Sequence, residues 1–225
     1  MDPFERPKKQ AILWDLDGVL IDTGEFHYRS WEETLPGYGI PFSRELFRQV
    51  FGMNNTGTLT RLAGHTLPAD LIAEISRKKE ENFRTQIRGQ AELLPGVAVM
   101  LSAFHEAGLA QAVASSAPQE NIDALIDELN IRRFFDAVIA GFRFPSKPDP
   151  RTFLAAAEAL RIPPTGCLVI EDSVAGVEGA RHAGMKCVAV TTTNPAEALT
   201  AADRVVAHPD DLSLEDYLKI LHAGE

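Results

Sequence analysis

Residues 11–18 read Ala-Ile-Leu-Trp-Asp-Leu-Asp-Gly, so four apolar residues are followed at once by two aspartates and a glycine. A short apolar run is typical of a buried parallel strand, and open α/β sheets bind ligands beyond the carboxyl ends of such strands. Asp15 and Asp17 would place like charges there, and each disfavours ionisation of the other. A cation between them, with one carboxylate left free for chemistry, explains the pair. The alternative is a strand-to-loop turn with solvated aspartates.

Strands and helices alternate along the chain from residue 93 onward. Apolar runs predict strands at 109–114, 136–140, 167–171 and 187–191. Proline or serine at the beginning, with glycine after two of them, predicts helices at 95–107, 150–160 and 173–183. This alternation implies right-handed crossovers, and we therefore predict an α/β fold with a Rossmann-like three-layer α/β/α core and a parallel sheet.

Residues 24–90 interrupt that pattern, because they contain helical periodicities but no convincing strand. The clearest helix is predicted at 68–87, where Leu71, Ile75, Phe83 and Ile87 step by four residues and Lys79 falls within the stripe. We predict an inserted all-helical cap domain at 23–91, and a core domain made of 1–22 and 92–225. Linkers near 22–24 and 90–93 would join them, with Gly24 and Gly89 as hinge positions.

The composition of the 225 residues is that of an ordinary globular protein, with 45% hydrophobic and 24% charged residues. The net charge of −10 argues against nucleic acids and anionic membranes as partners. Cys167 and Cys187 lie in apolar runs and are typical of core thiols in a reducing compartment. Met1 to Gln10 lacks a signal-peptide pattern, and no apolar stretch would span a bilayer. We expect a cytoplasmic monomer or weak homodimer.

Polar residues follow four of the predicted strands, at ends that share one edge of a parallel sheet. They are Asp15 and Asp17, then Ser115 and Ser116, then Lys147, and finally Glu171 and Asp172. Such carboxylates can hold a hard divalent cation such as Mg²⁺. Lys147 supplies a positive charge, Ser115 a hydroxyl donor, and the backbone amides of Ser116 and Ala117 could cradle anionic oxygens. This inventory suits phosphoryl transfer to a nucleophilic carboxylate.

Each of these residues also has a purely structural interpretation. Serines after a strand are often helix caps, and a lysine before proline is usually a solvated loop residue. Glu171 and Asp172, with Ser173, could cap the following helix and complement its dipole. Their joint placement at four strand ends favours a shared site over four unrelated ones.

With these residues in place, the chain resembles the haloacid dehalogenase superfamily, in its β-phosphoglucomutase and phosphoglycolate-phosphatase-like branch. The resemblance covers nearly the whole length. Asp15 to Thr23 matches the first family motif and Ser115 the second. Lys147, within Ser-Lys-Pro-Asp-Pro, matches the third, and Glu171 to Gly176 matches the fourth.

The resemblance implies a role for each matching residue. Asp15 would attack phosphorus and form an aspartyl-phosphate, and Asp17 would act as general acid and then general base. Mg²⁺ would be bound by the Asp15 carboxylate, the Asp17 backbone carbonyl and Asp172, with Glu171 nearby or through water. Ser115 and Lys147 would hold the phosphoryl oxygens. Dehalogenases of the superfamily lack the second aspartate, so Asp17 favours phosphate chemistry.

Three residues of the predicted cap match positions that contact substrate in β-phosphoglucomutase. His27 matches a histidine that contacts sugar and the acid-base aspartate, although it could simply pack beside Trp31 and Leu35. Lys79 matches a lysine that reaches the site, with a snorkelling side chain as the alternative. Asn55 aligns with an arginine that grips a second phosphate, and an uncharged amide there weakens bisphosphate binding.

Three functions are compatible with these observations. A Mg²⁺-dependent phosphatase acting on a small phosphorylated metabolite, such as a sugar phosphate, is favoured because Asn55 replaces the arginine. A mutase of the β-phosphoglucomutase type is the alternative. A non-catalytic regulatory protein is disfavoured, since a scaffold needs none of the charged residues at the strand ends.

Overall fold

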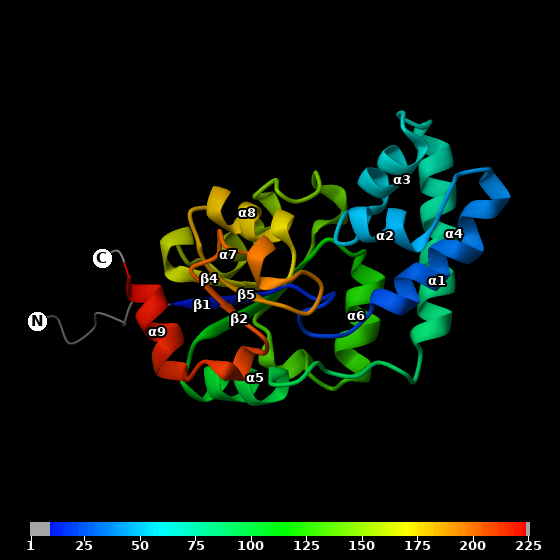
Figure 1. The fold of residues 1–225 in the computed structure, drawn as a ribbon. Coiled ribbons are helices and arrows are strands. Elements are labelled where there is room, and N and C mark those ends of the chain that lie inside the picture. Colours follow the sequence, from blue (N-terminus) through cyan, green and yellow to red (C-terminus); the bar gives the residue numbers. More distant parts are fainter. Residues whose placement is uncertain (1–9, 224–225) are drawn as a thin grey trace, which may run out of the picture.

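A six-stranded parallel sheet forms the centre of the computed structural model, which describes residues 10–223 (Figure 1). The strand order is β3-β2-β1-β4-β5-β6, and every neighbouring pair is parallel. The strands are β1 (Ala11–Trp14), β2 (Ala110–Ser115), β3 (Ala137–Ala140), β4 (Cys167–Glu171), β5 (Lys186–Val190) and β6 (Arg204–Val206). All four residues of β1 are buried, so this strand lies at the heart of the sheet with β2 and β4 as its neighbours.

Helices cover both faces of the sheet, because successive residues of a strand point to opposite sides. Ile12 and Trp14 of β1 pack in one apolar cluster with α5 (Val97–Glu106), α6 (Gln119–Glu128) and α9 (Leu214–His222). Ala11 and Leu13 pack in a second cluster with α7 (Arg151–Leu160) and α8 (Val174–His182). Figure 1 shows α5 and α9 on one side of the sheet and α7 and α8 on the other. The predicted three-layer α/β/α fold is confirmed.

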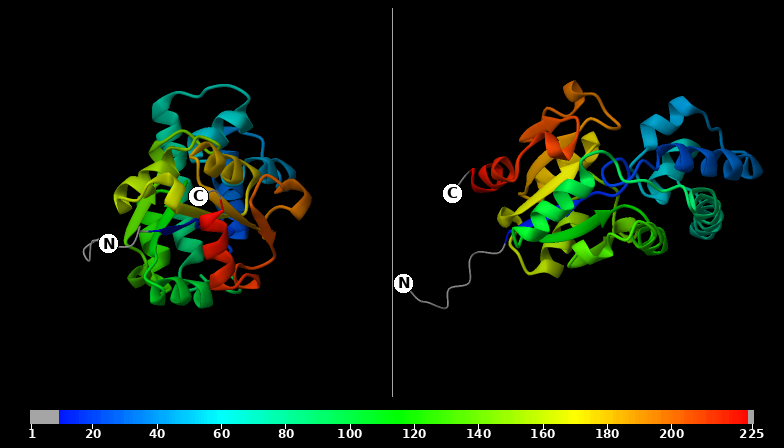
Figure 2. Two further views of the ribbon diagram at one scale, coloured as in Figure 1. Left: turned by 90° about the vertical axis from the view of Figure 1, so that its left-hand side faces the viewer. Right: turned by 90° about the horizontal axis from the view of Figure 1, so that it is seen from below.

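Four helices between β1 and α5 form a helical unit that stands to one side of the sheet (Figure 2). They are α1 (Gly24–Thr34), α2 (Arg44–Val50), α3 (Asn55–Ala63) and α4 (Ala69–Ile87). Trp31, Leu59 and Ile75 belong to an apolar cluster within this unit, whereas Phe83 and Ile87 of α4 pack in a cluster of the sheet. Helix α4 therefore joins both parts, and Lys79 lies where its buried face changes from one to the other.

The two chain segments that connect the helical unit to the sheet run side by side. Ile21 forms an antiparallel bridge with Leu93, and the Leu94 amide donates to the Leu20 carbonyl at 3.0 Å. Gly89 has a positive φ of 73°, whereas Gly24 is the first residue of α1. The division into a core of 1–22 and 92–225 and a cap of 23–91 stays a prediction, and its residues 1–9 and 224–225 lie outside the described residues.

Some elements differ from the sequence predictions. Strand β2 extends to Ser115, which makes this serine the last residue of the strand. Strand β6 was not predicted, since it has only three residues and none of them is buried. Helix α9 was not predicted either, although Ser213 caps it and it has a buried apolar face. Single 3-10 turns occur at Leu35–Tyr38, Arg132–Phe134, Gly141–Arg143, Pro164–Gly166, Ala196–Ala198 and Pro209–Asp211. Among residues 10–223, no helix combines the length and the apolar character that crossing a membrane requires.

Candidate active site

Asp15, Lys147 and Glu171 meet at the carboxyl edge of the sheet although they are far apart in sequence. Asp15 directly follows β1, and its amide donates to the Ile170 carbonyl of β4 at 3.0 Å, so the ladder fixes its position beside Glu171. Lys147, from the segment after β3, donates from Nζ to Asp15 Oδ1 at 2.6 Å and to Glu171 Oε1 at 2.5 Å. All three side chains are buried, so this is a shared site and Lys147 is not a solvated loop lysine.

Asp172 completes a group of three buried carboxylates with Asp15 and Glu171. One oxygen from each lies within 4.8 Å of the others, which suits a single cation. Thr193 Oγ1 donates to Asp172 Oδ2, and Asn194 Nδ2 donates to the Asp172 carbonyl at 3.0 Å. These bonds come from the segment after β5, a further strand end that the sequence analysis did not connect to the site.

Glu171 also organises the beginning of α8. Its Oε2 accepts the amides of Asp172 and Ser173, each at 2.8 Å, while Ser173 Oγ accepts the Gly176 amide at 3.0 Å as a helix cap. The capping interpretation of this motif is therefore correct for Ser173. The capping role of Ser173 is compatible with a role of Glu171 in the site, because Glu171 Oε1 faces Lys147.

Two glycines are required by the close approach of backbone to these carboxylates. Gly18 has a φ of 83°, and a Cβ on it would collide with the Asp172 carboxylate. A Cβ on Gly176 would collide with the Glu171 carboxylate. Any other residue at either position would displace an acidic side chain of the group.

The three carboxylates of Asp15, Glu171 and Asp172 face a single ammonium, that of Lys147. Burial raises the pKa of Asp15 to about 7, helped by the charges of Glu171 and Asp17 and opposed by Lys147. Burial and the charges of Glu171 and Asp15 also hold the pKa of Asp172 well above its usual range. Burial alone would lower the pKa of Lys147, but Asp15 and Glu171 raise it overall. Three carboxylates facing one ammonium fit a hard divalent cation with oxygen ligands.

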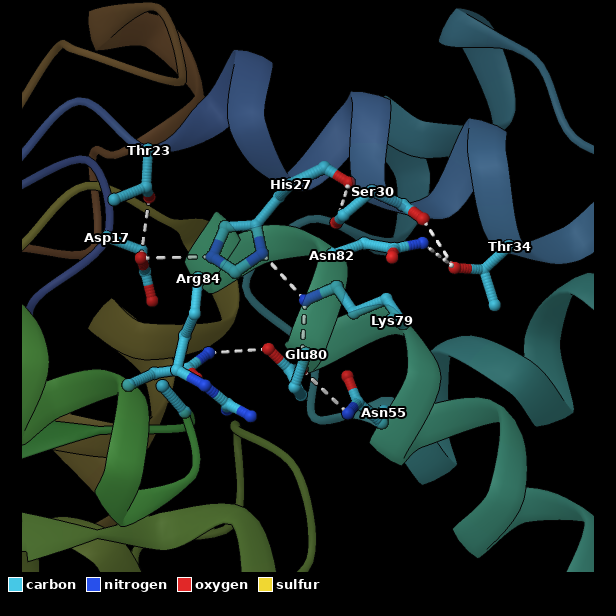
Figure 3. A network of polar contacts seen from close by, with 12 residues as sticks. Asp17, Thr23, His27, Ser30, Thr34, Asn55, Lys79, Glu80, Asn82 and Arg84 are labelled. Carbon is cyan, nitrogen blue, oxygen red and sulfur yellow. Dashed lines mark hydrogen bonds and ion pairs between the residues drawn. The ribbon is translucent and has the colours of Figure 1, made fainter. Parts of the chain in front are cut away.

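Asp17 lies beside this group but has different partners. Its Oδ1 accepts the Thr23 hydroxyl at 2.5 Å and is 3.2 Å from His27 Nε2 (Figure 3). Burial tends to raise the pKa of Asp17, but His27, Thr23 and Lys79 outweigh it and hold this pKa below its usual value. Because both donors engage Oδ1, Oδ2 is the oxygen left to face a ligand.

His27 is connected onward to Lys79 and Glu80 of α4 (Figure 3). Lys79 Nζ lies 2.7 Å from His27 Nδ1 and donates to Glu80 Oε1 at 2.9 Å. A charged lysine only donates, so Nδ1 must accept and Nε2 carries the proton that is donated to Asp17. The His27 ring also stacks on Phe83 with centroids 4.1 Å apart. Lys79 is only 2% exposed, so it does not snorkel to solvent.

The carboxylate of Glu80 lies between the helical unit and the sheet. Its Oε1 also accepts from Asn55 Nδ2 at 2.8 Å, and its Oε2 accepts from Asn121 Nδ2 at 2.5 Å. Burial would raise the pKa of Glu80, but Lys79, His27 and Asn55 lower it overall. Asn55, which the family resemblance matched to a phosphate-gripping arginine, thus binds a carboxylate.

A cavity of about 50 Å³ lies over these groups. Its lining includes most of the residues proposed from sequence to bind substrate or catalyse: Asp15, Asp17, His27, Asn55, Lys79, Ser116 and Ala117. Ser115 is fully buried at the end of β2 and accepts the Ala117 amide at 3.0 Å. The predicted cradle of two amides is therefore only partly available, because the Ala117 amide must leave Ser115 before it can bind a phosphoryl oxygen.

Several residues of this arrangement were missed from sequence: Thr23, Glu80, Arg84, Asn121 and Thr193. Glu80 follows Lys79 directly, and Asn121 precedes two residues of the buried face of α6, Ile122 and Leu125. A polar residue on an apolar helical face was the available signal in both cases.

Comparison with known proteins agrees with this geometry. A family model described as haloacid dehalogenase-like hydrolase matches residues 9–184. The chain is 30% identical to a β-phosphoglucomutase of Bacillus subtilis over an alignment of 214 residues that covers 92% of this chain and 92% of that one. It is 32% identical to the fructose-1-phosphate phosphatase YqaB of Escherichia coli over 182 residues, covering 80% of this chain and 95% of that one.

A solved structure extends the comparison to the fold. A crystal structure of CbbY from Rhodobacter sphaeroides in complex with xylulose-(1,5)bisphosphate superposes with a TM-score of 0.79 and 31% identity. The match covers 89% of this chain and 94% of that chain. The chain therefore belongs to the haloacid dehalogenase-like hydrolases, in the group that contains β-phosphoglucomutase and CbbY.

Proposed function

We propose that this protein is a Mg²⁺-dependent phosphatase that hydrolyses a small phosphorylated metabolite of the sugar phosphate class. The observation that carries the proposal is that Asp15 and Asp17 face one cavity while different partners hold them. Asp15 is held by Lys147 within a group of carboxylates, and Asp17 is held by Thr23 and His27. Two carboxylates in different environments can divide the roles of nucleophile and acid-base group.

The reaction would proceed in two displacements at phosphorus. An Asp15 oxygen attacks phosphorus, the bond from phosphorus to the substrate oxygen breaks, and Asp17 gives a proton to the departing alcohol. Asp17 then takes a proton from water as that water attacks the aspartyl-phosphate, and the bond from phosphorus to Asp15 breaks to release inorganic phosphate. Oδ2 of Asp17 would carry the proton, since Oδ1 is occupied by Thr23 and His27.

The ligands for Mg²⁺ would be the Asp15 carboxylate, the Asp17 backbone carbonyl and Asp172, with Glu171 nearby or through water. The buried group of Asp15, Glu171 and Asp172 supports this assignment. When bound, the ion would neutralise charge on the phosphoryl oxygens. Lys147 and the Ser115 hydroxyl would hold those oxygens in line with Asp15, and Lys147 would stabilise the charge that develops during transfer.

The substrate class is inferred from the relatives and from the cap residues. One relative is a fructose-1-phosphate phosphatase, and the CbbY structure holds xylulose-(1,5)bisphosphate. The hydroxyl groups of a sugar suit the donors and acceptors that line the cavity at Asn55, Lys79 and Glu80. We infer that Asn55 and Lys79 contact the sugar part of the substrate, whereas Glu80 holds both of these side chains in place.

A mutase of the β-phosphoglucomutase type is the second candidate, favoured by the similarity to the Bacillus subtilis enzyme over 92% of the chain. Asn55 argues against it. Its amide binds Glu80, so this position offers a carboxylate where a second phosphate would need a cation. Water would then react with the aspartyl-phosphate more easily than a second sugar phosphate would.

The test measures phosphate release from fructose 1-phosphate and p-nitrophenyl phosphate, with Mg²⁺ and with excess EDTA. We expect release only with Mg²⁺, and a loss of at least about 10³-fold in Asp15→Asn because the nucleophile is removed. Asp22→Asn, at an exposed aspartate close by in sequence, is the matched control and should retain activity. Undiminished release in Asp15→Asn would refute the phosphatase. Conversion of β-glucose 1-phosphate to glucose 6-phosphate that outruns release would establish the mutase.

A further inference from the structure

Asn121 of α6 is bound by two residues of α4 that lie one helical turn apart. Its Nδ2 donates to Glu80 Oε2 at 2.5 Å, and its Oδ1 accepts from Arg84 Nη1 at 2.7 Å. Asn121 is 1% exposed and Glu80 is 5% exposed, so the bond between them is shielded from water. A side chain of a helix that covers the sheet is thus bound by two residues of the helical unit.

The two sides of this contact carry different parts of the site. Helix α6 begins directly after the segment Ser115 to Pro118, three residues of which line the cavity. On the other side, Glu80 binds Lys79, Lys79 binds His27, and His27 binds Asp17 (Figure 3). The contact at Asn121 therefore joins the segment after β2 to the chain of side chains that ends at Asp17.

The amide of Asn121 satisfies both of its neighbours, because it offers a donor and an acceptor. Glu80 needs a donor, because its pKa is held low and its carboxylate is ionised, and Arg84 needs an acceptor. An aspartate would still accept from Arg84, but it would place a second negative charge against Glu80. A leucine would leave both Glu80 and Arg84 without this partner.

We infer that Asn121 is a positioning residue for the reaction. It docks α4 against α6 in the arrangement in which Lys79 and His27 hold Asp17 over the cavity. The effect on turnover rests on the proposed function, whereas the effect on the geometry of His27 does not. Asn121 does not line the cavity, so it acts through Glu80.

The test exchanges donor and acceptor across the Glu80–Asn121 contact. Asn121→Asp and Glu80→Gln each break the bond, since the first removes the donor and the second the charged acceptor. The double variant restores it, because the glutamine amide introduced on α4 can donate to the aspartate introduced on α6, while the glutamine oxygen still accepts from Lys79 and Asn55. Asn82→Asp is the matched control, since Asn82 of α4 binds Thr34 within the helical unit.

Acid-base catalysis contributes about 10²- to 10⁴-fold to turnover, and loss of positioning should remove part of it. We expect kcat for fructose 1-phosphate to fall about 10- to 100-fold in Asn121→Asp, with KM changed by less than about threefold. The double variant should recover kcat to within about fivefold of the wild type, and Asn82→Asp should stay within about twofold. A loss confined to thermal stability, with kcat unchanged, would overturn the inference.

An NMR measurement on the His27 ring tests this inference without any substrate turnover, so its result does not depend on the proposed function. The ¹⁵N shifts of the His27 ring, assigned by their loss in His27→Gln, report its protonated Nε2 and its accepting Nδ1. These shifts should move in Asn121→Asp and return in the double variant, even if no sugar phosphate is hydrolysed. Unchanged shifts in a folded Asn121→Asp protein would overturn the inference. Should Asn121→Asp fail to fold, Glu80→Gln breaks the same bond and is judged by the same rescue.

Discussion

Two buried polar clusters, one at the edge of the sheet and one between the helical unit and α6, differ in their balance of charge. The sheet-edge cluster consists of Asp15, Lys147, Glu171 and Asp172, so three carboxylates face one ammonium. The helix-side cluster consists of His27, Lys79, Glu80 and Asn121, where one ammonium meets one carboxylate and both are hydrogen-bonded to the remaining side chains. The first cluster has an excess of carboxylates that suits a cation, whereas the second pairs its ammonium and its carboxylate with each other.

The difference shows how a buried network can be assigned a role. Unpaired charge in a dry site is costly, so an unbalanced cluster indicates a missing ligand. A balanced and fully hydrogen-bonded cluster needs no ligand and instead holds its members in one geometry. We therefore propose that the sheet-edge cluster carries the chemistry at phosphorus and that the helix-side cluster positions Asp17.

Lys147→Met should have the largest effect. It leaves three buried carboxylates without their ammonium, and removal of one partner of a buried ion pair costs about 3–5 kcal/mol. It also removes a cation from the phosphoryl oxygens, so kcat should fall at least about 10³-fold. Urea unfolding in EDTA and phosphate release with Mg²⁺ measure the two effects. If the Lys147→Met variant were as stable in EDTA as the wild type, that result would contradict the excess of negative charge assigned to this cluster.

Lys79→Met should have the next largest effect, because it leaves Glu80 buried without its charged partner. We expect a loss of about 3 kcal/mol in the free energy of unfolding and a fall in kcat of about 10- to 100-fold. Lys78→Met is the matched control, since Lys78 is exposed on the same helix. Equal losses in the two variants would show that the helix-side cluster is not a paired network.

Asp172→Asn tests the opposite behaviour of the sheet-edge cluster. Removing one of three like charges should leave stability in EDTA unchanged or raise it, unlike the loss expected at Lys79. In the wild type, Mg²⁺ at about 100 times its Kd adds about 2.7 kcal/mol, which corresponds to roughly 5–10 °C in Tm. Thermal unfolding of Asp172→Asn should show that shift reduced by more than half. A full Mg²⁺ shift in the variant would exclude Asp172 as a ligand.

Glu25→Gln should have the smallest effect on the free energy of unfolding. It tests whether an exposed ion pair contributes less to stability than a buried one. Arg44 and Arg29 hold the pKa of Glu25 at about 2, but the pair is solvated and is worth at most about 1 kcal/mol. Because this pKa is lower in the folded state, its contribution is present above about pH 4.5 and disappears as pH falls toward 2. Urea unfolding at pH 7 and at pH 3 would show it. If Glu25→Gln lost as much stability as Lys79→Met, buried and exposed ion pairs would not differ in this protein.

Much of the fold followed from local signals. The apolar runs predicted β1 through β5, with β2 and β5 each shifted by one residue, and the end signals predicted α5, α7 and α8. Strand β6 was missed because a three-residue strand without buried residues carries no periodicity. Helix α9 was missed although its serine cap and its apolar face were visible signals. The placement of Asp15 beside Glu171 was also predictable, since neighbouring parallel strands end at one edge.

From sequence alone we could predict the parallel α/β fold and propose a chemistry for the sheet edge, because contiguous motifs after apolar strands carry both. The family resemblance implied that His27 contacts Asp17. Packing alone determined that Asn55 and Asn121 both bind Glu80, and that Lys79 binds His27. These partners lie on separate helices whose relative rotation and depth depend on many apolar contacts. Charge balance in the helical unit is therefore a property of tertiary structure, whereas the charge excess at the sheet edge is already present in the motifs.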